Sequence, residues 1–151
     1  MAMREYMAAL DDSQPDAALA LMDERLQFLL ALPAGTVRGT SKADYVAYLA
    51  GRQAPPDRRH VIQRFAVDGD VELAYGVVTE GGRIAGAFQS CARVTPQGLM
   101  LRYLSLFDPV FALVDPSDDG PAASVPGSTM SGSTMSGSTM SGSTVSGTRF
   151  R

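Results

Sequence analysis

The hydrophobic spacing of this chain changes once along its length, near Arg59. Upstream of this residue, apolar positions recur at helical spacing or follow helix-start signals in three segments, at 3–10, 13–22 and 41–51. Downstream of it, apolar and polar residues alternate in four segments separated by short turns, at 60–67, 71–79, 84–94 and 99–107. A continuous apolar run at 26–32 has the length of one more strand. This order predicts an α+β fold in which three N-terminal helices pack against a strongly bent antiparallel sheet.

Two of the three expected helices begin with the spacing of a capping box. Ser13 is followed by Asp16, and Ser41 is followed by Asp44, so each serine can accept a hydrogen bond from the first turn of its helix. Gly51 stands where the third helix should end. Because three helices cannot cover both faces of the sheet, one face is left for a pocket or for a second subunit. We therefore expect a homodimer that packs through the exposed sheet face.

The last part of the chain differs in composition from the rest. Large apolar residues almost disappear after Pro116, and a Gly-Ser-Thr-Met-Ser unit repeats there with a period of five residues. A Gly/Ser-rich repeat of this kind cannot bury a hydrophobic core. The sequence therefore predicts one folded domain at 1–115 and a disordered tail at 116–151 that carries no catalytic residue.

Composition argues against several classes of function. The chain is 45% hydrophobic with a net charge of −3, and it has no basic stripe that would bind a nucleic acid. Cys91 is the only cysteine and His60 the only histidine, which excludes an internal disulfide and argues against a metal site; no cofactor is expected. No apolar run approaches the ~20 residues of a membrane span, and no signal peptide is recognisable. We expect a cytoplasmic protein without metal, nucleic-acid or membrane partners.

The order of the expected elements and four short stretches resemble the nuclear transport factor 2-like superfamily. The stretches are Tyr-Met-Ala-Ala-Leu-Asp at 6–11, Val-Arg-Gly at 37–39, Val-Asp-Gly-Asp at 67–70 and the strand end at 102–109. The resemblance covers about residues 4–114. Within the superfamily the chain looks most like the SnoaL-like group of small polyketide cyclases, and ketosteroid isomerases and scytalone dehydratases are more distant. The resemblance implies a cone-shaped fold with a deep apolar cavity. Proteins with this fold include isomerases, dehydratases, cyclases, epoxide hydrolases and proteins without catalytic activity.

The resemblance implies a chemical role for Tyr6 and His60. Tyr6 falls where ketosteroid isomerases place an oxyanion-hole tyrosine, and a phenol there could donate a hydrogen bond to an enolate oxygen. His60 stands at the start of a strand, like the histidine in the His-Phe-Ile stretch of scytalone dehydratases, and an imidazole can act as acid or base near neutral pH. The alternatives are a tyrosine at the edge of the core and a histidine that caps a strand beside Arg58 and Arg59.

The same comparison argues against a steroid-type isomerase. Ser90 takes the place of the protonated aspartate that ketosteroid isomerases carry in the oxyanion hole, and a serine hydroxyl is a much less acidic donor. Their general base would fall near Leu29 or Leu30, where this chain has no carboxylate. The paired aspartates with a neighbouring arginine that epoxide hydrolases of this fold require are also missing from the sequence pattern. Neither activity is expected.

Strand alternation predicts the wall of a pocket. If Ser90 points inward, every second residue on its strand and on the following strand faces the same side, whereas Cys91 and Arg102 face outward. Two tyrosines of the third helix could close the mouth. The predicted ligand-binding residues are Leu29, Tyr45, Tyr48, Phe88, Ser90, Tyr103, Ser105 and Phe107. Such a cavity suits an aromatic or polycyclic apolar ligand, although the same side chains could instead meet and fill the core.

Three functions fit this pattern, in decreasing order of support. The first is a SnoaL-like pocket protein that cyclises, dehydrates or isomerises a hydrophobic small molecule, with His60 as acid/base and Tyr6 as hydrogen-bond donor. The second is a non-catalytic protein that binds such a ligand in the same pocket, which the missing carboxylate near Leu29 favours. The third is a protein-interaction module that uses the exposed face of the sheet.

Overall fold

A computed structural model describes residues 1–114 of the chain. These residues form three helices and six strands, in the order α1 (Ala2–Asp11), α2 (Pro15–Ala20), β1 (Met22–Leu32), β2 (Gly35–Gly39), α3 (Lys42–Gly51), β3 (Arg59–Asp68), β4 (Val71–Glu80), β5 (Arg83–Val94) and β6 (Met100–Asp108). The predicted α+β class is confirmed, as are the three helices and the four consecutive strands from β3 to β6. The predicted tail at 116–151 lies outside the described residues.

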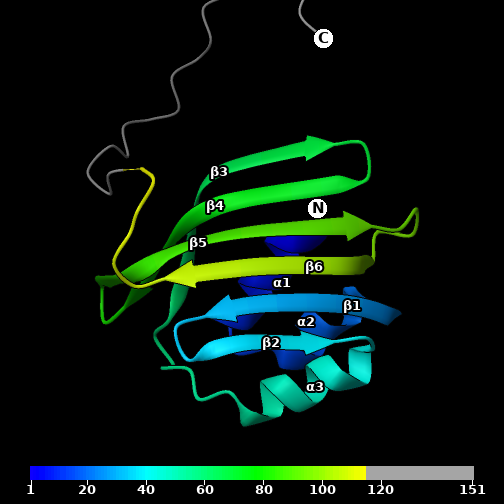
Figure 1. Cartoon of the computed structure of the whole chain (residues 1–151), viewed down its shortest axis with the longest axis horizontal. Coiled ribbons are helices and arrows are strands. Elements are labelled where there is room, and N and C mark those ends of the chain that lie inside the picture. Colours follow the sequence, from blue (N-terminus) through cyan, green and yellow to red (C-terminus); the bar gives the residue numbers. More distant parts are fainter. Residues whose placement is uncertain (115–151) are drawn as a thin grey trace, which may run out of the picture. The chain divides into compact units, whose positions relative to one another are not determined.

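The strands within residues 1–114 form one sheet with the order β2-β1-β6-β5-β4-β3 (Figure 1). β3 to β6 form an antiparallel meander, and β1 and β2 form an antiparallel hairpin. β1 and β6 run parallel, with Phe28 opposite Tyr103, so the predicted antiparallel sheet is corrected to a mixed one. Parallel pairing leaves no turn signal in the sequence, because a long crossover joins the two strands. β2 was also missed, since only five residues with a glycine at each end show too little alternation.

The junction between α1 and α2 differs from the predicted capping box. Ser13 lies in the left-handed region (φ +57°), where its backbone N–H donates to the carbonyl of Leu10 at 3.1 Å. The N–H of Gln14 donates to the carbonyl of Ala9 at 2.8 Å. These two bonds form a Schellman motif that ends α1. Gln14 holds the N-cap position of α2 without a side-chain bond, so the prediction that Ser13 starts this helix was wrong.

Replacing Ser13 by glycine should therefore stabilise the protein. The left-handed conformation costs an L-residue about 1–2 kcal/mol, and glycine adopts it freely, at the expense of a larger entropy loss on folding. We expect a net gain of about 0.5–1 kcal/mol in the free energy of unfolding, measured by urea denaturation. Ser41→Gly is the matched control, because it removes a real N-cap and should lower stability slightly. A loss of stability in Ser13→Gly would contradict the assignment.

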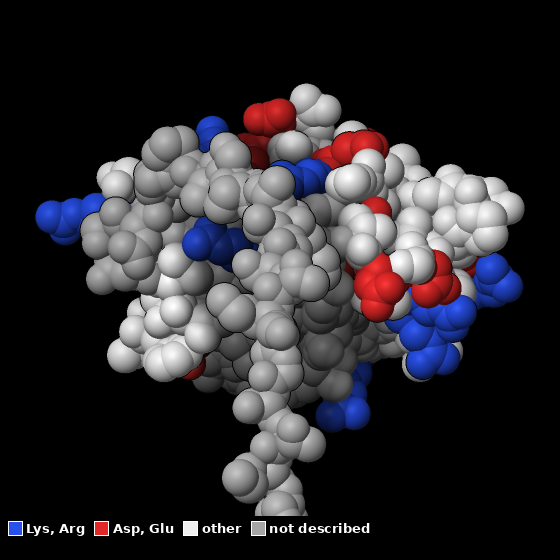
Figure 2. Space-filling view, turned by 90° about the horizontal axis from the view of Figure 1, so that it is seen from above, with Lys and Arg blue, Asp and Glu red and all other residues white. Residues whose placement is uncertain are grey.

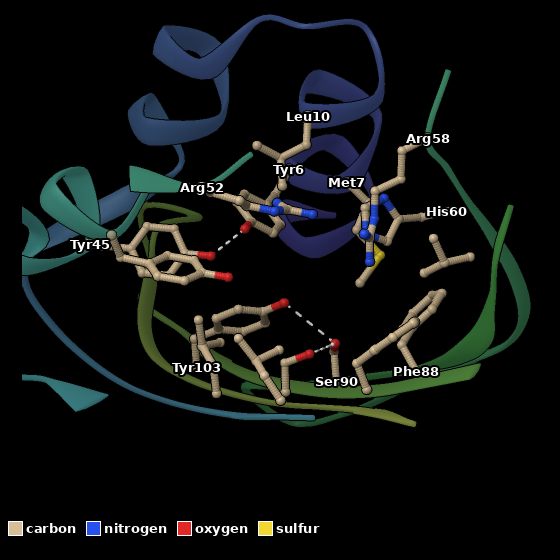
Figure 3. Close-up of a pocket in the computed structure, with 16 residues that line it drawn as sticks. Tyr6, Met7, Leu10, Tyr45, Arg52, Arg58, His60, Phe88, Ser90 and Tyr103 are labelled. Carbon is tan, nitrogen blue, oxygen red and sulfur yellow. Dashed lines mark hydrogen bonds between the residues drawn. The ribbon is translucent and has the colours of Figure 1, made fainter. Parts of the chain in front are cut away.

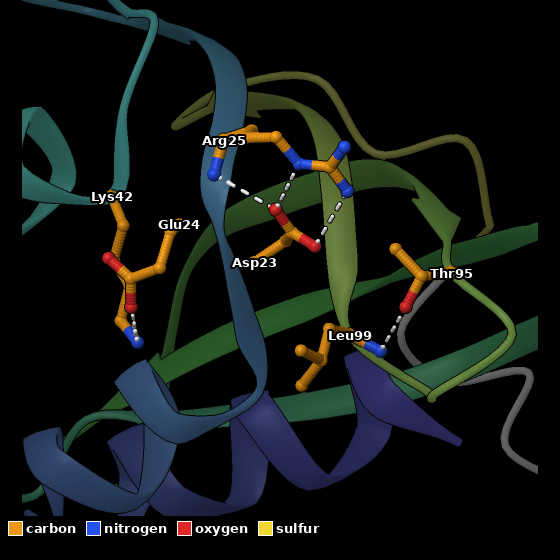
Figure 4. A network of polar contacts seen from close by, with 6 residues as sticks. All are labelled: Asp23, Glu24, Arg25, Lys42, Thr95 and Leu99. Carbon is orange, nitrogen blue, oxygen red and sulfur yellow. Dashed lines mark hydrogen bonds and ion pairs between the residues drawn. The ribbon is translucent and has the colours of Figure 1, made fainter.

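α3 begins as the sequence predicts. Oγ of Ser41 accepts a hydrogen bond from the N–H of Asp44 at 3.1 Å, and the carboxylate of Asp44 accepts one from the N–H of Ser41 at 3.0 Å. One residue further on, the ammonium of Lys42 contacts the carboxylate of Glu24 on β1 at 2.9 Å (Figure 4). The capping box and this ion pair together fix the start of α3 beside β1.

The core lies between the helices and one face of the sheet, which we call the inner face (Figure 1). Its largest fully buried side chains are Met3, Met22, Leu26, Tyr45, Val78 and Met100. The carboxylate of Glu72, buried on β4, accepts hydrogen bonds from the backbone N–H groups of Ala2 and Met3 at 3.1 and 2.8 Å. Since the first N–H groups of a helix have no partner within the helix, Glu72 satisfies them and fixes α1 on the sheet.

The surface carries charges of both signs. Figure 2 shows acidic and basic side chains on the same face of the molecule, and Asp70 and Arg93 form an exposed ion pair at 2.6 Å. In the part of the chain that the structure describes, no helix is long and apolar enough to span a bilayer, and no cluster of three metal-binding side chains occurs. On the outer face of the sheet, Leu104 and Leu106 are 49% and 50% exposed. This outer face is therefore partly apolar.

Candidate functional site

A cavity of about 60 Å³ lies between α1, α3 and the inner face of the sheet. Figure 3 shows the helices on one side of it and the strands curving around the other. Nine of the ten residues predicted to be catalytic or ligand-binding line this cavity: Tyr6, Tyr45, Tyr48, His60, Phe88, Ser90, Tyr103, Ser105 and Phe107. Helices α1 and α3 and strands β3, β5 and β6 bring these side chains together, while their chemical roles remain predictions.

Leu29 is the exception, because it lies on the outer face of the sheet. It lines a surface hollow together with Arg102 and Cys91, which do face outward as the alternation predicts. Leu30 takes its place in the inner cavity. The run from Leu26 to Leu32 is apolar at almost every position, so its pattern does not reveal which face each residue takes.

Three tyrosines from different elements meet on one side of the cavity. The hydroxyl groups of Tyr6 on α1 and Tyr45 on α3 are hydrogen-bonded to each other (Figure 3). The ring of Tyr103 on β6 contacts both at edge-on angles, with centroid distances of 5.6 Å to Tyr6 and 6.3 Å to Tyr45. Burial raises the pKa of all three phenols, so they are neutral at physiological pH. The hydrogen bond between Tyr6 and Tyr45 uses the proton of only one of the two hydroxyl groups. The hydroxyl that accepts this bond can therefore donate its own proton to a ligand.

A second group of hydroxyls lies on the floor of the cavity. Oγ of Ser90 on β5 is 2.9 Å from Oγ of Ser105 on β6 and 3.4 Å from the hydroxyl of Tyr103. Ser90 is fully buried, and these neighbours satisfy its hydroxyl without any charged group. The floor therefore offers neutral hydrogen-bond donors and acceptors to a ligand.

His60 makes a close contact with a carboxylate that the sequence analysis did not single out. Nδ1 of His60 lies 2.6 Å from Oδ1 of Asp11, the last residue of α1, and the backbone N–H of His60 donates to Oδ2 of Asp11 at 2.7 Å. Both side chains are only 13% exposed. A carboxylate can only accept, so Nδ1 carries the proton and Nε2 of the neutral imidazole is an acceptor. This is the arrangement of an oriented general base.

The contact between Asp11 and His60 could not be found from local sequence patterns, because 49 positions separate the two residues. Asp11 is the last residue of the stretch at 6–11 that carries part of the family resemblance. This position was the one feature of the sequence that could have pointed to Asp11 as a site residue. The ring of His60 is also held from the other side by Phe88, with a centroid distance of 5.5 Å and an angle of 78° between the rings. The imidazole is thus fixed by a hydrogen bond and by packing.

A second, wider cavity of about 330 Å³ lies outside the first, and we call it the vestibule. Leu10, Arg52, Arg58 and His60 line both cavities, so these four residues lie where the two cavities adjoin, and we call this boundary the passage. The loop after α3 contributes the outer wall, including Pro55. His60 therefore lies at the boundary between the inner cavity and the vestibule, and Arg52 and Arg58 lie at the same boundary.

The inner cavity is too small for the polycyclic ligand that the sequence suggested. Ligand sites of drug-sized molecules usually measure about 300–1,000 Å³, several times its volume. Part of the predicted wall, including Phe88 and Phe107, fills the core, which was the alternative interpretation of these residues. A ligand that reaches His60 would extend through the passage into the vestibule.

Solved structures with the same fold have been described under several activities. A candidate ketosteroid isomerase from Kribbella flavida is 20% identical, with a TM-score of 0.59 over 84% of this chain and 89% of that one. IdmH, a candidate polyketide cyclase from Streptomyces antibioticus, is 15% identical, with a TM-score of 0.58 over 71% and 89%. An NTF2-like protein of unknown function from Cytophaga hutchinsonii is 17% identical, with a TM-score of 0.55 over 72% and 88%. These likenesses confirm the predicted nuclear transport factor 2-like fold.

The family is defined more closely by sequence. The model of the SnoaL-like domain family matches residues 3–149, almost the whole chain, and the protein belongs to this family. The predicted resemblance to SnoaL-like proteins is thereby confirmed. No curated protein matches the chain. The activity and the ligand of this protein must therefore be inferred from its site.

Proposed function

We propose that this protein is a cofactor-independent enzyme that moves a proton on a hydrophobic carbonyl compound, in a cyclisation, dehydration or isomerisation. The observation that carries the proposal is the contact of Asp11 with His60, because His60 lines the same cavity as Tyr6, Tyr45 and Tyr103. All three reactions need a base for a carbon-bound proton and a donor for the oxygen that becomes negative. The site provides both.

The proposed sequence of events begins with removal of a proton from the carbon next to the carbonyl. Nε2 of His60 accepts this proton, and Asp11 stabilises the imidazolium that forms. The electron pair moves to the carbonyl oxygen, where a tyrosine phenol donates a hydrogen bond to the enolate. The imidazolium then returns its proton to another carbon in an isomerisation, to a departing hydroxide in a dehydration, or to the new alkoxide in a cyclisation.

The position of this base differs from that expected for ketosteroid isomerases. The residues of β1 that line the cavity are Leu30 and Leu32, and neither has a carboxylate. Here the base stands on β3 instead, and its carboxylate partner comes from the end of α1. The lack of an acid on β1, which favoured a non-catalytic protein, therefore does not leave the site without a base.

Proton exchange in heavy water tests this proposal without knowledge of the natural substrate. Acetophenone and 3-benzoylpropionate are aromatic ketones, one neutral and one with a carboxylate, and both have exchangeable protons next to the carbonyl. We expect the protein to accelerate deuterium incorporation at this carbon, measured by NMR. If the ketones bind and no exchange above the buffer rate occurs, the protein is a non-catalytic ligand-binding protein, the second of the three functions that fit the sequence.

The outer face of the sheet supports the proposal of a homodimer. Leu104 and Leu106 lie next to each other on this face and are about half exposed, which is unusual for adjacent leucines on a monomer surface. We expect a dimeric mass in sedimentation velocity and a monomeric mass for Leu104→Glu. Val46→Glu, on the exposed side of α3, is the control and should leave the mass unchanged. A monomeric wild-type protein would refute the dimer.

The remaining partners and the location follow from sequence arguments only. A cytoplasmic protein that binds a small hydrophobic molecule, without a nucleic acid, a membrane or a metal, stays our proposal. The acidic and basic side chains that lie together on the face seen in Figure 2 support it, because a mixed surface attracts a polyanion less than a basic one does.

A further inference from the structure

The vestibule is lined by two arginines, one of which has no acidic partner within residues 1–114. Four titratable side chains line it, Asp11, Arg52, Arg58 and His60. Asp11 is engaged by His60, and Nη1 of Arg58 contacts Oε1 of Glu80 at 2.9 Å. The guanidinium of Arg52 forms neither an ion pair nor a side-chain hydrogen bond within residues 1–114. It is left as a half-buried cation that faces the passage to the inner cavity.

Arg58 also has donor capacity that the described residues do not use. Its side chain is 21% exposed, and its Nε is buried without a hydrogen-bond partner in residues 1–114. Burial and the neighbouring charge of Arg52 lower the pKa of this guanidinium, and both arginines line the same two cavities. A buried donor without an acceptor is unfavourable, so the side chain of Arg58 would gain from a rearrangement that brings an acceptor to Nε.

The position of Arg52 is set by the end of α3. Arg52 is the C-cap residue of this helix, and its backbone N–H donates to the carbonyl of Leu49 at 3.1 Å. Figure 3 shows Arg52 and Arg58 extending from opposite sides into the space above Phe88 and Ser90. Both guanidinium groups therefore approach the passage where His60 stands.

We propose that the ligand is an amphipathic carboxylic acid, whose carboxylate binds between Arg52 and Arg58 while its apolar part enters the inner cavity. A carboxylate would give the guanidinium of Arg52 an acidic partner, and it accepts hydrogen bonds from planar guanidinium groups in a favourable geometry. The aromatic rings and uncharged hydroxyl groups of the inner cavity suit the apolar end of such a molecule. This inference rests on the site of the proposed function and adds the chemical class of its substrate.

The anchoring of a carboxylate would also explain how a small molecule presents its carbonyl to His60. The passage residues line both cavities, so a ligand held at the arginines and in the inner cavity passes the imidazole between its two ends. Fixing both ends confines the reacting carbon near the base, which is the usual way in which binding accelerates proton transfer. A ligand without the carboxylate would lack one of the two anchors.

Calorimetric titration with matched acids and amides tests the inference. The probes are 3-benzoylpropionate and cinnamate, each compared with its own carboxamide, which has almost the same shape and no charge. We expect each acid to bind about 10- to 100-fold more tightly than its amide. Arg52→Gln should remove this preference without disturbing the fold, because Arg52 makes no other polar side-chain contact within residues 1–114. Arg64→Gln, an exposed arginine on β3, is the matched control and should keep the preference.

Every result of this titration bears on the inference. Equal affinity of acids and amides, or no binding of either acid at millimolar concentration, would overturn it. Tighter binding of phenyl phosphate than of both acids would overturn the assignment to a carboxylate. Binding and exchange measured on the wild-type protein separate the two proposals: preference for acids without proton exchange overturns only the catalysis, whereas exchange of neutral acetophenone without any preference for acids overturns only the carboxylate site.

Discussion

His60→Gln is expected to lower the rate of deuterium incorporation into a bound aromatic ketone by about 10²–10⁴-fold, the usual contribution of a general base. Glutamine has a similar length and can still donate a hydrogen bond to Asp11, so the passage keeps its shape. It cannot accept a proton from carbon. Affinity for the ketone, measured by calorimetry, should therefore change little while exchange is lost. Exchange at the wild-type rate in this variant would refute the role of His60.

Asp11→Asn probes the same base through its partner. Asparagine can donate a hydrogen bond to Nδ1 of His60, which favours the wrong tautomer, and it cannot stabilise the imidazolium. The exchange rate should fall, though less than in His60→Gln, since the imidazole itself is still present. Asp12→Asn is the matched control: Asp12 is the exposed neighbour of Asp11, and this change should leave the rate as in the wild type. A similar fall in both variants would mean that the effect is not specific to the pair.

The part of the site that lies on the meander could be predicted from the sequence, because strand alternation is local and strict. Once Ser90 was taken as inward, the same parity placed Phe88 on its own strand and Tyr103 and Ser105 on the next, and all of them line the cavity. The outward direction of Arg102 followed in the same way. In a half-buried antiparallel sheet every second residue faces the same side, so the inward direction of Ser90, taken from the family resemblance, was enough to predict this wall.

The rest of the site depends on contacts that no local pattern records. The prediction that Leu29 points inward rests on analogy, because β1 is apolar on both faces and its pattern does not show which residues point inward. A shift of one residue along such a strand moves every side chain to the opposite face. Asp11 meets His60 only after α1 has packed across β3, and Arg52 becomes part of the passage only because α3 ends beside it. In each case the decisive geometry is the packing of one element on another, which residue spacing does not contain.

Removal of the Glu72 carboxylate should produce the largest loss of stability among the changes considered. In Glu72→Ala, the N–H groups of Ala2 and Met3 lose a buried charged acceptor, and they are covered by protein and not by water. Bonds to charged groups contribute about 1.5–3 kcal/mol each, and two bonds to one carboxylate are not fully additive. We expect the free energy of unfolding to fall by about 2–4 kcal/mol in urea, a large fraction of the stability of a domain of this size.

The same substitution should also weaken the site, because α1 carries both Tyr6 and Asp11. Glu72→Gln keeps a neutral acceptor and should lose about half as much stability as Glu72→Ala. Glu5→Ala removes another carboxylate from the start of α1, but one that is 63% exposed, so it should cost under about 1 kcal/mol. If Glu72→Ala were no more destabilising than Glu5→Ala, the two backbone bonds would not fix α1 on the sheet. The geometry of the Asp11–His60 pair would then depend on the apolar packing of α1 and not on its buried N-terminal anchor.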